Sequence, residues 1–193
     1  MGREMELKYA VTEYQQELLF QAFGEDFETI RMETVYYDTR DRQLSSRFIT
    51  LRRRLENDTS VCTVKTPDPR GGRGEWECVC QDIQEALPRL IAQGAPEELL
   101  CWCAAGLEPV CGARFTRRAR RLELPHSEIE LALDRGVLLG GGKEVPLCEV
   151  EMELKAGTEE DLEFYARYMA ERYDLHPETR SKFQRAKALS EEV

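Results

Sequence analysis

Hydrophobic and polar residues alternate along several stretches of the chain. Residues 4–10 read EMELKYA, in which apolar positions 5, 7 and 9 separate the charged residues Glu4, Glu6 and Lys8. Residues 149–155 read EVEMELK and repeat the arrangement. A period of two is typical of a strand with one buried face. On this pattern we expect strands near residues 4–10, 33–39, 47–56, 60–66, 73–80, 111–124, 127–135 and 145–155.

Helices are expected between some of these strands. Thr12 and Gln15 have the spacing of a capping box and predict a helix to about residue 23. Thr158 and Asp161 predict another helix, which carries an apolar stripe from position 162 to 173. Further helices are expected over 82–105, as one or two pieces broken near Pro88 and around 94–96, and over 179–190. Short connections, including the turn at Gly140-Gly141-Gly142, favour antiparallel pairing.

The charged faces of the strands leave two arrangements open. In an open sheet the apolar face packs under the helices and the charged face meets water. In a closed sheet the charged faces line a lumen, and no strand edge is left exposed. Burying so many charges is costly unless they are paired or bind a highly charged ligand. A closed sheet therefore predicts metal ions and a polyanion inside it.

Length and composition narrow the class of protein. The 193 residues are most simply one domain, 1–193, with a net charge of −10 and a sequence pI near 4.9. This charge argues against broad nucleic-acid binding, which needs a basic surface. No apolar run approaches the ~20 residues of a membrane span, and charges interrupt the first ten residues. We therefore expect a cytoplasmic protein that binds neither nucleic acid nor membrane.

Seven cysteines indicate reduced thiols rather than disulfides. The count is odd, and the C-V-C and C-W-C pairs lack the two-residue gap of usual zinc sites. We interpret them as small apolar core residues.

A family resemblance appears in the first strand. The stretch Glu4-Met5-Glu6-Leu7-Lys8 is similar to the E-x-E-x-K signature of the CYTH family, the triphosphate tunnel metalloenzymes. Further stretches resemble the family in the same order. They are YDT at 37–39, LRRR at 51–54, TVKTP at 63–67, RGEWE at 73–77, ALDRG at 132–136, EVEME at 149–153 and SKFQR at 181–185.

The resemblance spans residues 4–185 and implies an α+β fold. This fold is an eight-stranded antiparallel β-barrel, the triphosphate tunnel, with helices packed outside and a C-terminal helix near the tunnel mouth. It favours the closed sheet. The stretch from Ala132 to Gly157 looks most like the inorganic triphosphatase branch, which implies metal-dependent hydrolysis of tripolyphosphate to pyrophosphate and phosphate.

The resemblance also implies the site residues. Carboxylates on two strands would bind Mg²⁺ or Mn²⁺, which prefer oxygen ligands. Alternatively, Glu153 pairs with basic neighbours, and Glu130 and Asp134 position other side chains of the tunnel. The implied metal ligands are Glu4, Glu6, Glu130, Asp134, Glu149, Glu151 and Glu153.

Cations would hold the phosphate oxygens, arginine through its planar fork and lysine as a compact charge. Two of these cations, Arg118 and Arg120, lie in a stretch that is basic on both faces, so alternation does not show which residues face inward. The implied substrate-binding residues are Lys8, Arg52, Arg54, Lys65, Arg73, Arg118, Arg120, Lys182 and Arg185.

Catalysis would fall to Glu149 or Glu151, orienting an ion or the attacking water, and to Lys182, steadying charge on the phosphate. A class IV adenylate cyclase or a thiamine triphosphatase on the same fold is one alternative. A non-catalytic polyphosphate-binding sensor is another. The partner is then a small-molecule triphosphate, and the apolar outer faces leave room for a homodimer.

Overall fold

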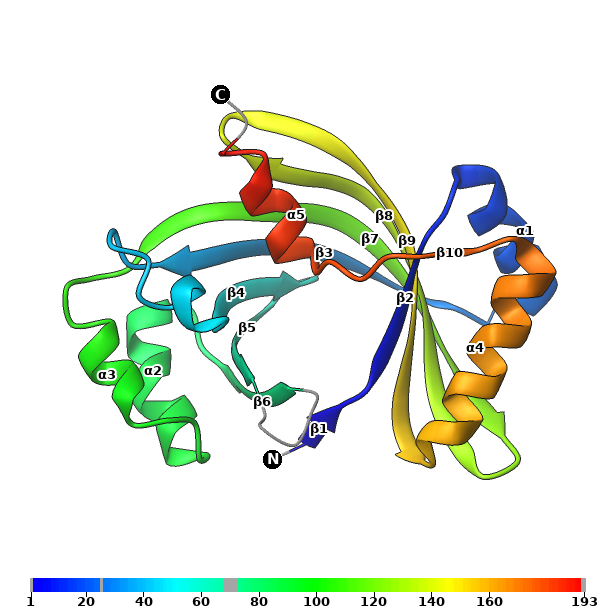
Figure 1. The fold of residues 1–193 in the computed structure, drawn as a ribbon, viewed down its shortest axis with the longest axis horizontal. Coiled ribbons are helices and arrows are strands. Elements are labelled where there is room, and N and C mark those ends of the chain that lie inside the picture. The colour runs from blue at the N-terminus through cyan, green and yellow to red at the C-terminus, as the bar shows by residue number, and fades with distance from the viewer. Residues whose placement is uncertain (1, 25, 68–72, 192–193) are drawn as a thin grey trace.

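The computed structural model describes residues 2–24, 26–67 and 73–191 (Figure 1). Residues 2–4 are described by their backbone alone. The strands are β1 (Gly2–Glu4), β2 (Glu6–Ala10), β3 (Glu28–Asp38), β4 (Thr50–Glu56), β5 (Thr59–Pro67), β6 (Arg73–Val79), β7 (Glu108–Leu124), β8 (Ser127–Gly140), β9 (Lys143–Gly157) and β10 (His176–Pro177). The helices are α1 (Glu13–Phe23), the 3₁₀ helix η1 (Ser45–Arg47), α2 (Ile83–Ala92), α3 (Glu98–Trp102), α4 (Glu159–Tyr173) and α5 (Lys182–Ala188).

The N-terminal segment joins both ends of one antiparallel sheet. The strand order is β1-β6-β5-β4-β3-β7-β8-β9-β2-β10. β1 pairs with β6, while β2, which follows in the same segment, pairs with β9. In Figure 1 the dark-blue segment runs from the β6 side to the β9 side. Segment 2–10 and strands β3 to β9 thus make eight strands around a lumen, which confirms the predicted antiparallel barrel fold.

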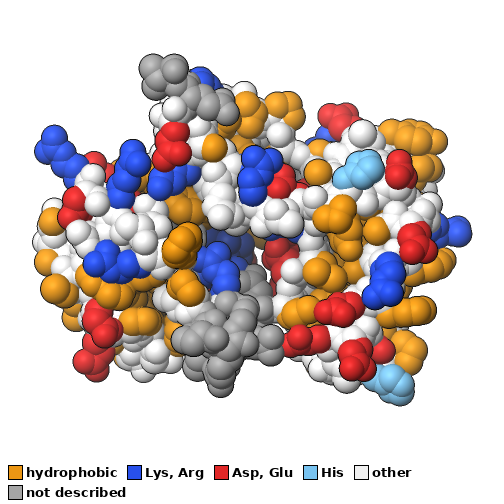
Figure 2. All heavy atoms as spheres, viewed as in Figure 1, with side chains coloured by type: hydrophobic (Ala, Val, Ile, Leu, Met, Phe, Trp, Pro, Cys, Tyr) orange, Lys and Arg blue, Asp and Glu red, His pale blue; other side chains and the backbone are white. Residues whose placement is uncertain are grey.

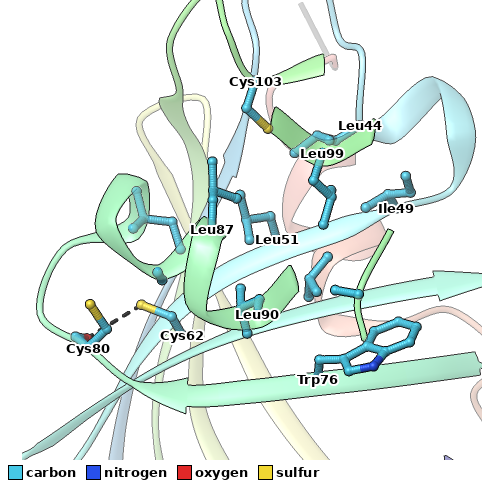
Figure 3. Packing of buried hydrophobic residues seen from close by; sticks show 14 residues of the cluster. Leu44, Ile49, Leu51, Cys62, Trp76, Cys80, Leu87, Leu90, Leu99 and Cys103 are labelled. Atoms are coloured by element: carbon cyan, nitrogen blue, oxygen red, sulfur yellow. Dashed lines mark hydrogen bonds between the residues drawn. The ribbon is translucent and has the colours of Figure 1, made fainter. Parts of the chain in front are cut away.

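Helices cover the outside of the sheet on two sides (Figure 1). α2 and α3 pack on β4, β5 and β6 through a core that includes Leu51, Trp76, Leu90 and Leu99 (Figure 3). α1 and α4 cover β2, β8 and β9 through a second core, in which Met152 is fully buried. Because the apolar strand faces pack under these helices, the charged faces lie inside. No helix in the described part of the chain has both the length and the apolar character to span a membrane.

The structure corrects the expected break at Pro88. α2 continues through this residue and ends near Gln93. The helix loses one backbone hydrogen bond there, because proline has no N–H. It retains a buried face that includes Ile83, Ala86 and Leu90, and this packing holds the helix together.

Several boundaries also differ from the expected ones. β3 begins at Glu28 rather than near 33, and β4 begins at Thr50 rather than near 47, where the 3₁₀ helix η1 ends. The capping box of Thr12 and Gln15 is present. At α4, in contrast, Thr158 makes no side-chain cap, and Asp161 accepts a hydrogen bond from the His126 N–H at 2.8 Å.

A tight hairpin joins β8 to β9 and extends both strands past the barrel. Gly140 pairs with Lys143, and the two residues between them, Gly141 and Gly142, have φ of 58° and 74°. Two left-handed residues suit a two-residue hairpin turn, which confirms the turn expected at this glycine run. α5 lies against the extended strands, with Ala186 buried in a third apolar cluster (Figure 1).

Candidate active site

The barrel encloses a cavity of about 1180 Å³. Figure 2 shows the centre of this face hollowed, with basic side chains on one side of the hollow and acidic side chains on the other. Eight basic and eight acidic residues are among those that line the cavity in the described part of the chain. They are Lys8, Arg52, Arg54, Lys65, Arg73, Arg117, Lys155 and Lys182, and Glu6, Glu56, Glu75, Glu77, Glu130, Glu151, Glu153 and Glu178.

Three buried carboxylates converge on the side of β8 and β9. Asp134 of β8 lies opposite Glu149 of β9, and Glu151 follows two residues later on the same face. One oxygen from each lies within 4.8 Å of the others, and all three side chains are buried. The alternation of β9 and its register with β8 bring these groups together.

Two cations occupy the space among these carboxylates. The Nζ of Lys182, at the start of α5, lies 2.7 Å from Asp134 Oδ2 and 2.7 Å from Glu151 Oε1, and it also contacts Glu149. Arg117 of β7 donates to both oxygens of Asp134, at 2.8 and 2.7 Å, and to Glu151. The carboxylates are thus paired with donors from two other elements.

The pKa values of Glu149 and Glu151 are shifted in opposite directions. Burial raises the pKa of Glu149, an effect that Lys182 opposes and Glu151 reinforces. Burial also acts to raise the pKa of Glu151, but Lys182, Arg117 and Lys8 outweigh it and hold this pKa well below its usual range. Glu151 is therefore an anion at neutral pH.

The pKa of Lys182 is raised for the converse reason. Burial disfavours its charged form, but the carboxylates of Asp134, Glu151 and Glu149 favour the cation more strongly. The same balance, with Asp134 and Glu151, raises the pKa of Arg117. Both side chains are therefore permanent cations in the cavity at neutral pH.

β4, β5 and β6 contribute the basic side of the cavity. Glu75 of β6 lies 3.3 Å from Lys65 and 3.7 Å from Arg52, and Glu56 pairs with Arg54. Burial and the neighbouring Arg52 lower the pKa of Arg54. Arg52 and Arg54 thus repel each other although glutamates pair with both, and a bound polyanion would relieve this repulsion.

The acidic side continues along β2, β9 and β8. Glu6, Glu153 and Glu130 follow one another across the three strands. Lys155 lies 2.7 Å from Glu153 and 3.7 Å from Glu130, which matches the alternative in which Glu153 pairs with a basic neighbour. Lys8 lies 3.0 Å from Glu6 and 3.5 Å from Glu151.

Two of the expected cations, Arg118 and Arg120, lie on the outer face of β7. Arg118 stacks on the Phe20 ring of α1, with 4.3 Å from Cζ to the centroid, and Arg120 donates to the carbonyl of Phe23. Arg117, which lies on the opposite face of β7, enters the cavity instead. Sequence reasoning missed Arg117 because both faces of this stretch are basic. Its pairing with buried Asp134 required the β7–β8 register.

The other expected residues lie in or beside the cavity. Lys8, Arg52, Arg54, Lys65, Arg73 and Lys182 line it, and Arg185 contacts Glu149 from α5. The Glu4 side chain lies outside the described residues, although its backbone pairs with Arg73.

The donor set suits a hard divalent cation. Asp134, Glu149 and Glu151 offer carboxylate oxygens only, and Glu6, Glu130 and Glu153 continue the acidic row. Cations already engage both oxygens of each carboxylate in this cluster. Arg117 donates to both oxygens of Asp134, Lys182 and Arg117 share those of Glu151, and Lys182 and Arg185 share those of Glu149. A metal ion bound here would therefore have to displace some of these contacts.

A known protein is similar to this chain in sequence. An inorganic triphosphatase from Haemophilus influenzae is 28% identical over 158 residues, which cover 80% of this chain and 44% of that protein. The chain thus spans less than half the length of this relative.

Two solved structures share the fold. One is a putative adenylate cyclase from Bacillus halodurans, with a TM-score of 0.63, 20% identity and coverage of 96% of this chain and 98% of that one. The other is a putative adenylyl cyclase from Hippeastrum, described as having a dominant triphosphatase activity, with a TM-score of 0.66, 17% identity and coverage of 96% and 95%. The CYTH domain model matches residues 2–186, and the chain therefore belongs to the CYTH family, as its motifs predicted.

Proposed function

We propose that this protein hydrolyses inorganic triphosphate to pyrophosphate and phosphate inside the barrel, with Mg²⁺ or Mn²⁺ as cofactor. The observation that carries the proposal is the two-sided cavity, with arginines and lysines from β4, β5 and β6 facing buried carboxylates from β8 and β9. The name of the Haemophilus relative supports the choice of substrate.

The balance of charge supports a need for metal. The sixteen charged lining residues named above, all from the described part of the chain, divide equally between the two signs. A triphosphate that enters without a cation gives this cavity a large uncompensated negative charge, which a low-dielectric site does not tolerate. Glu6, Glu149, Glu151 and Glu153 would hold the cation, with Glu130 and Asp134 beside them. When bound, the ion neutralises developing phosphate charge and lowers the pKa of water.

The chain's own residues would bind and orient the substrate. Arg52, Arg54, Lys65 and Arg73 would bind non-bridging oxygens of the triphosphate from the basic side. Arg117 and Lys182 would reach it from the opposite side and stabilise the charge that develops on the transferred phosphoryl group. Glu149 and Glu151 would orient the attacking water.

The test is an assay of the purified protein with tripolyphosphate, ATP and thiamine triphosphate, each with Mg²⁺, Mn²⁺ or chelator. We expect metal-dependent release of phosphate and pyrophosphate from tripolyphosphate and little turnover of the other two. Cyclic AMP and pyrophosphate from ATP would replace the proposal with a cyclase. Preferred turnover of thiamine triphosphate would identify a thiamine triphosphatase instead. Tight binding of tripolyphosphate without turnover would indicate a sensor.

A further inference from the structure

A buried aspartate organises the loop between β3 and β4. Asp38, at the end of β3, accepts hydrogen bonds from the backbone N–H groups of Thr39, Leu44 and Ser45 at 2.8, 2.9 and 3.1 Å. Its side chain is buried and touches no group of the proposed reaction. Three donors on one carboxylate fix the path of the loop, since charge-assisted hydrogen bonds are short and strong.

The loop conformation needs this support. Arg42 and Phe48 have φ of 60° and 58°, in the left-handed region that disfavours residues other than glycine. Phe48 is also 76% exposed, so packing of its own side chain contributes little. The Asp38 hydrogen bonds and the burial of Leu44 therefore hold a backbone that the local sequence does not favour.

Two contacts lead from this loop to two elements that supply cavity residues. The Ser45 hydroxyl accepts a hydrogen bond from Lys187 Nζ of α5 at 3.0 Å. The Phe48 carbonyl accepts one from Arg73 of β6 at 3.2 Å. α5 also carries Lys182, which lies among the buried carboxylates. The loop thus touches both the helix that supplies Lys182 and the strand that supplies Arg73.

We propose that Asp38 is a positioning residue for the cavity, because it holds residues 39–48 in one conformation. Through Ser45 this loop positions α5, and through the Phe48 carbonyl it positions the Arg73 side chain. Ser45 and Lys187 are the link on the α5 side. The predicted effects on turnover rest on the proposed function, whereas the structural link does not.

Hydrogen exchange of the backbone amides, measured without substrate, tests the link directly. We expect Ser45→Ala to speed exchange in residues 182–188 by about 10-fold, the typical effect of losing a hydrogen bond to a charged group. Asp38→Asn should speed exchange in residues 39–48 as well, and exchange in β8 and β9 should stay unchanged. Ser45→Thr keeps the hydroxyl and should restore wild-type exchange.

Ser46→Ala is the matched control, because the Ser46 hydroxyl bonds within its own loop: it donates to the Gln43 carbonyl at 3.3 Å and accepts from Arg47 at 3.4 Å. Wild-type exchange in α5 of Ser45→Ala, or equal acceleration by Ser46→Ala, would overturn the inference.

Tripolyphosphate kinetics supply the second arm. Ser45→Ala should lower kcat through Lys182 with little change in KM, whereas Asp38→Asn should also raise KM through Arg73. Equal kinetics of the two variants and the wild type would overturn the positioning role. A wild-type protein without turnover would instead refute the proposed function, and the exchange result would still decide whether Asp38 and Ser45 hold α5.

Discussion

At the scale of single residues, Arg117 has the most consequential placement. Its guanidinium forks across both oxygens of Asp134 and reaches Glu151, and both of these carboxylates are buried. A lysine can keep the charge at this position but cannot reproduce the planar, bidentate contact. The adjacent Arg118 points the opposite way and stacks on Phe20.

We therefore expect Arg117→Lys to lower kcat/KM for tripolyphosphate on the order of 100-fold, the cost of losing a fixed donor in a preorganised site. Arg118→Lys, its neighbour on the outer face, should stay within about twofold, since exposed substitutions away from the site have small effects. Steady-state kinetics on both proteins, with circular dichroism to confirm folding, makes the measurement. Equal losses in the two variants would contradict the inward placement of Arg117.

At the scale of elements, the barrel is assembled from locally predictable strands, while α5 depends on a close approach. A Cβ added at Gly140 would lie 2.1 Å from the carbonyl oxygen of Ala186, so the hairpin accepts α5 only because position 140 has no side chain. Gly142, two residues further, has open space around it and a φ of 74°. The two glycines therefore serve different purposes.

Gly140→Ala should displace α5, lower the free energy of unfolding by about 1–3 kcal/mol, as overpacking does, and reduce turnover because Lys182 moves with the helix. Gly142→Ala should cost about 1 kcal/mol through its left-handed backbone and leave kcat unchanged. The measurements are urea unfolding and tripolyphosphate kinetics on both glycine variants. A Gly140→Ala protein with wild-type kcat would show that α5 tolerates the shift.

At the scale of the whole molecule, the distribution of charge separates the cavity from the surface. The chain has a net charge of −10, yet the sixteen charged lining residues in the described part of the chain balance one another. An acidic protein can thus bind a polyanion, because the relevant field is that of the cavity rather than of the net charge. The balance also means that the anion and a metal cation should enter together.

Thermal unfolding can measure this coupling, because a ligand that binds only the folded state raises Tm. We expect tripolyphosphate and Mg²⁺ together to raise Tm by more than the sum of their separate effects, and chelator to remove the excess. Sulfate with Mg²⁺, which cannot span both sides of the cavity, serves as the control. Purely additive shifts would indicate that the anion and the metal bind independently.

Alternation, capping and short motifs are local properties of the chain, and they were enough to predict most of the strands, the charged strand faces outside β7 and the family. Tertiary structure decided the rest. Whether the charged faces meet in a lumen depends on segment 2–10 pairing with both β6 and β9. Arg117 was selected over Arg118 by the register of β7 with β8. Lys182 reaches Glu151, 31 positions earlier, only because α5 packs back on the extended strands. These contacts join residues far apart in the chain, so no local pattern reports them.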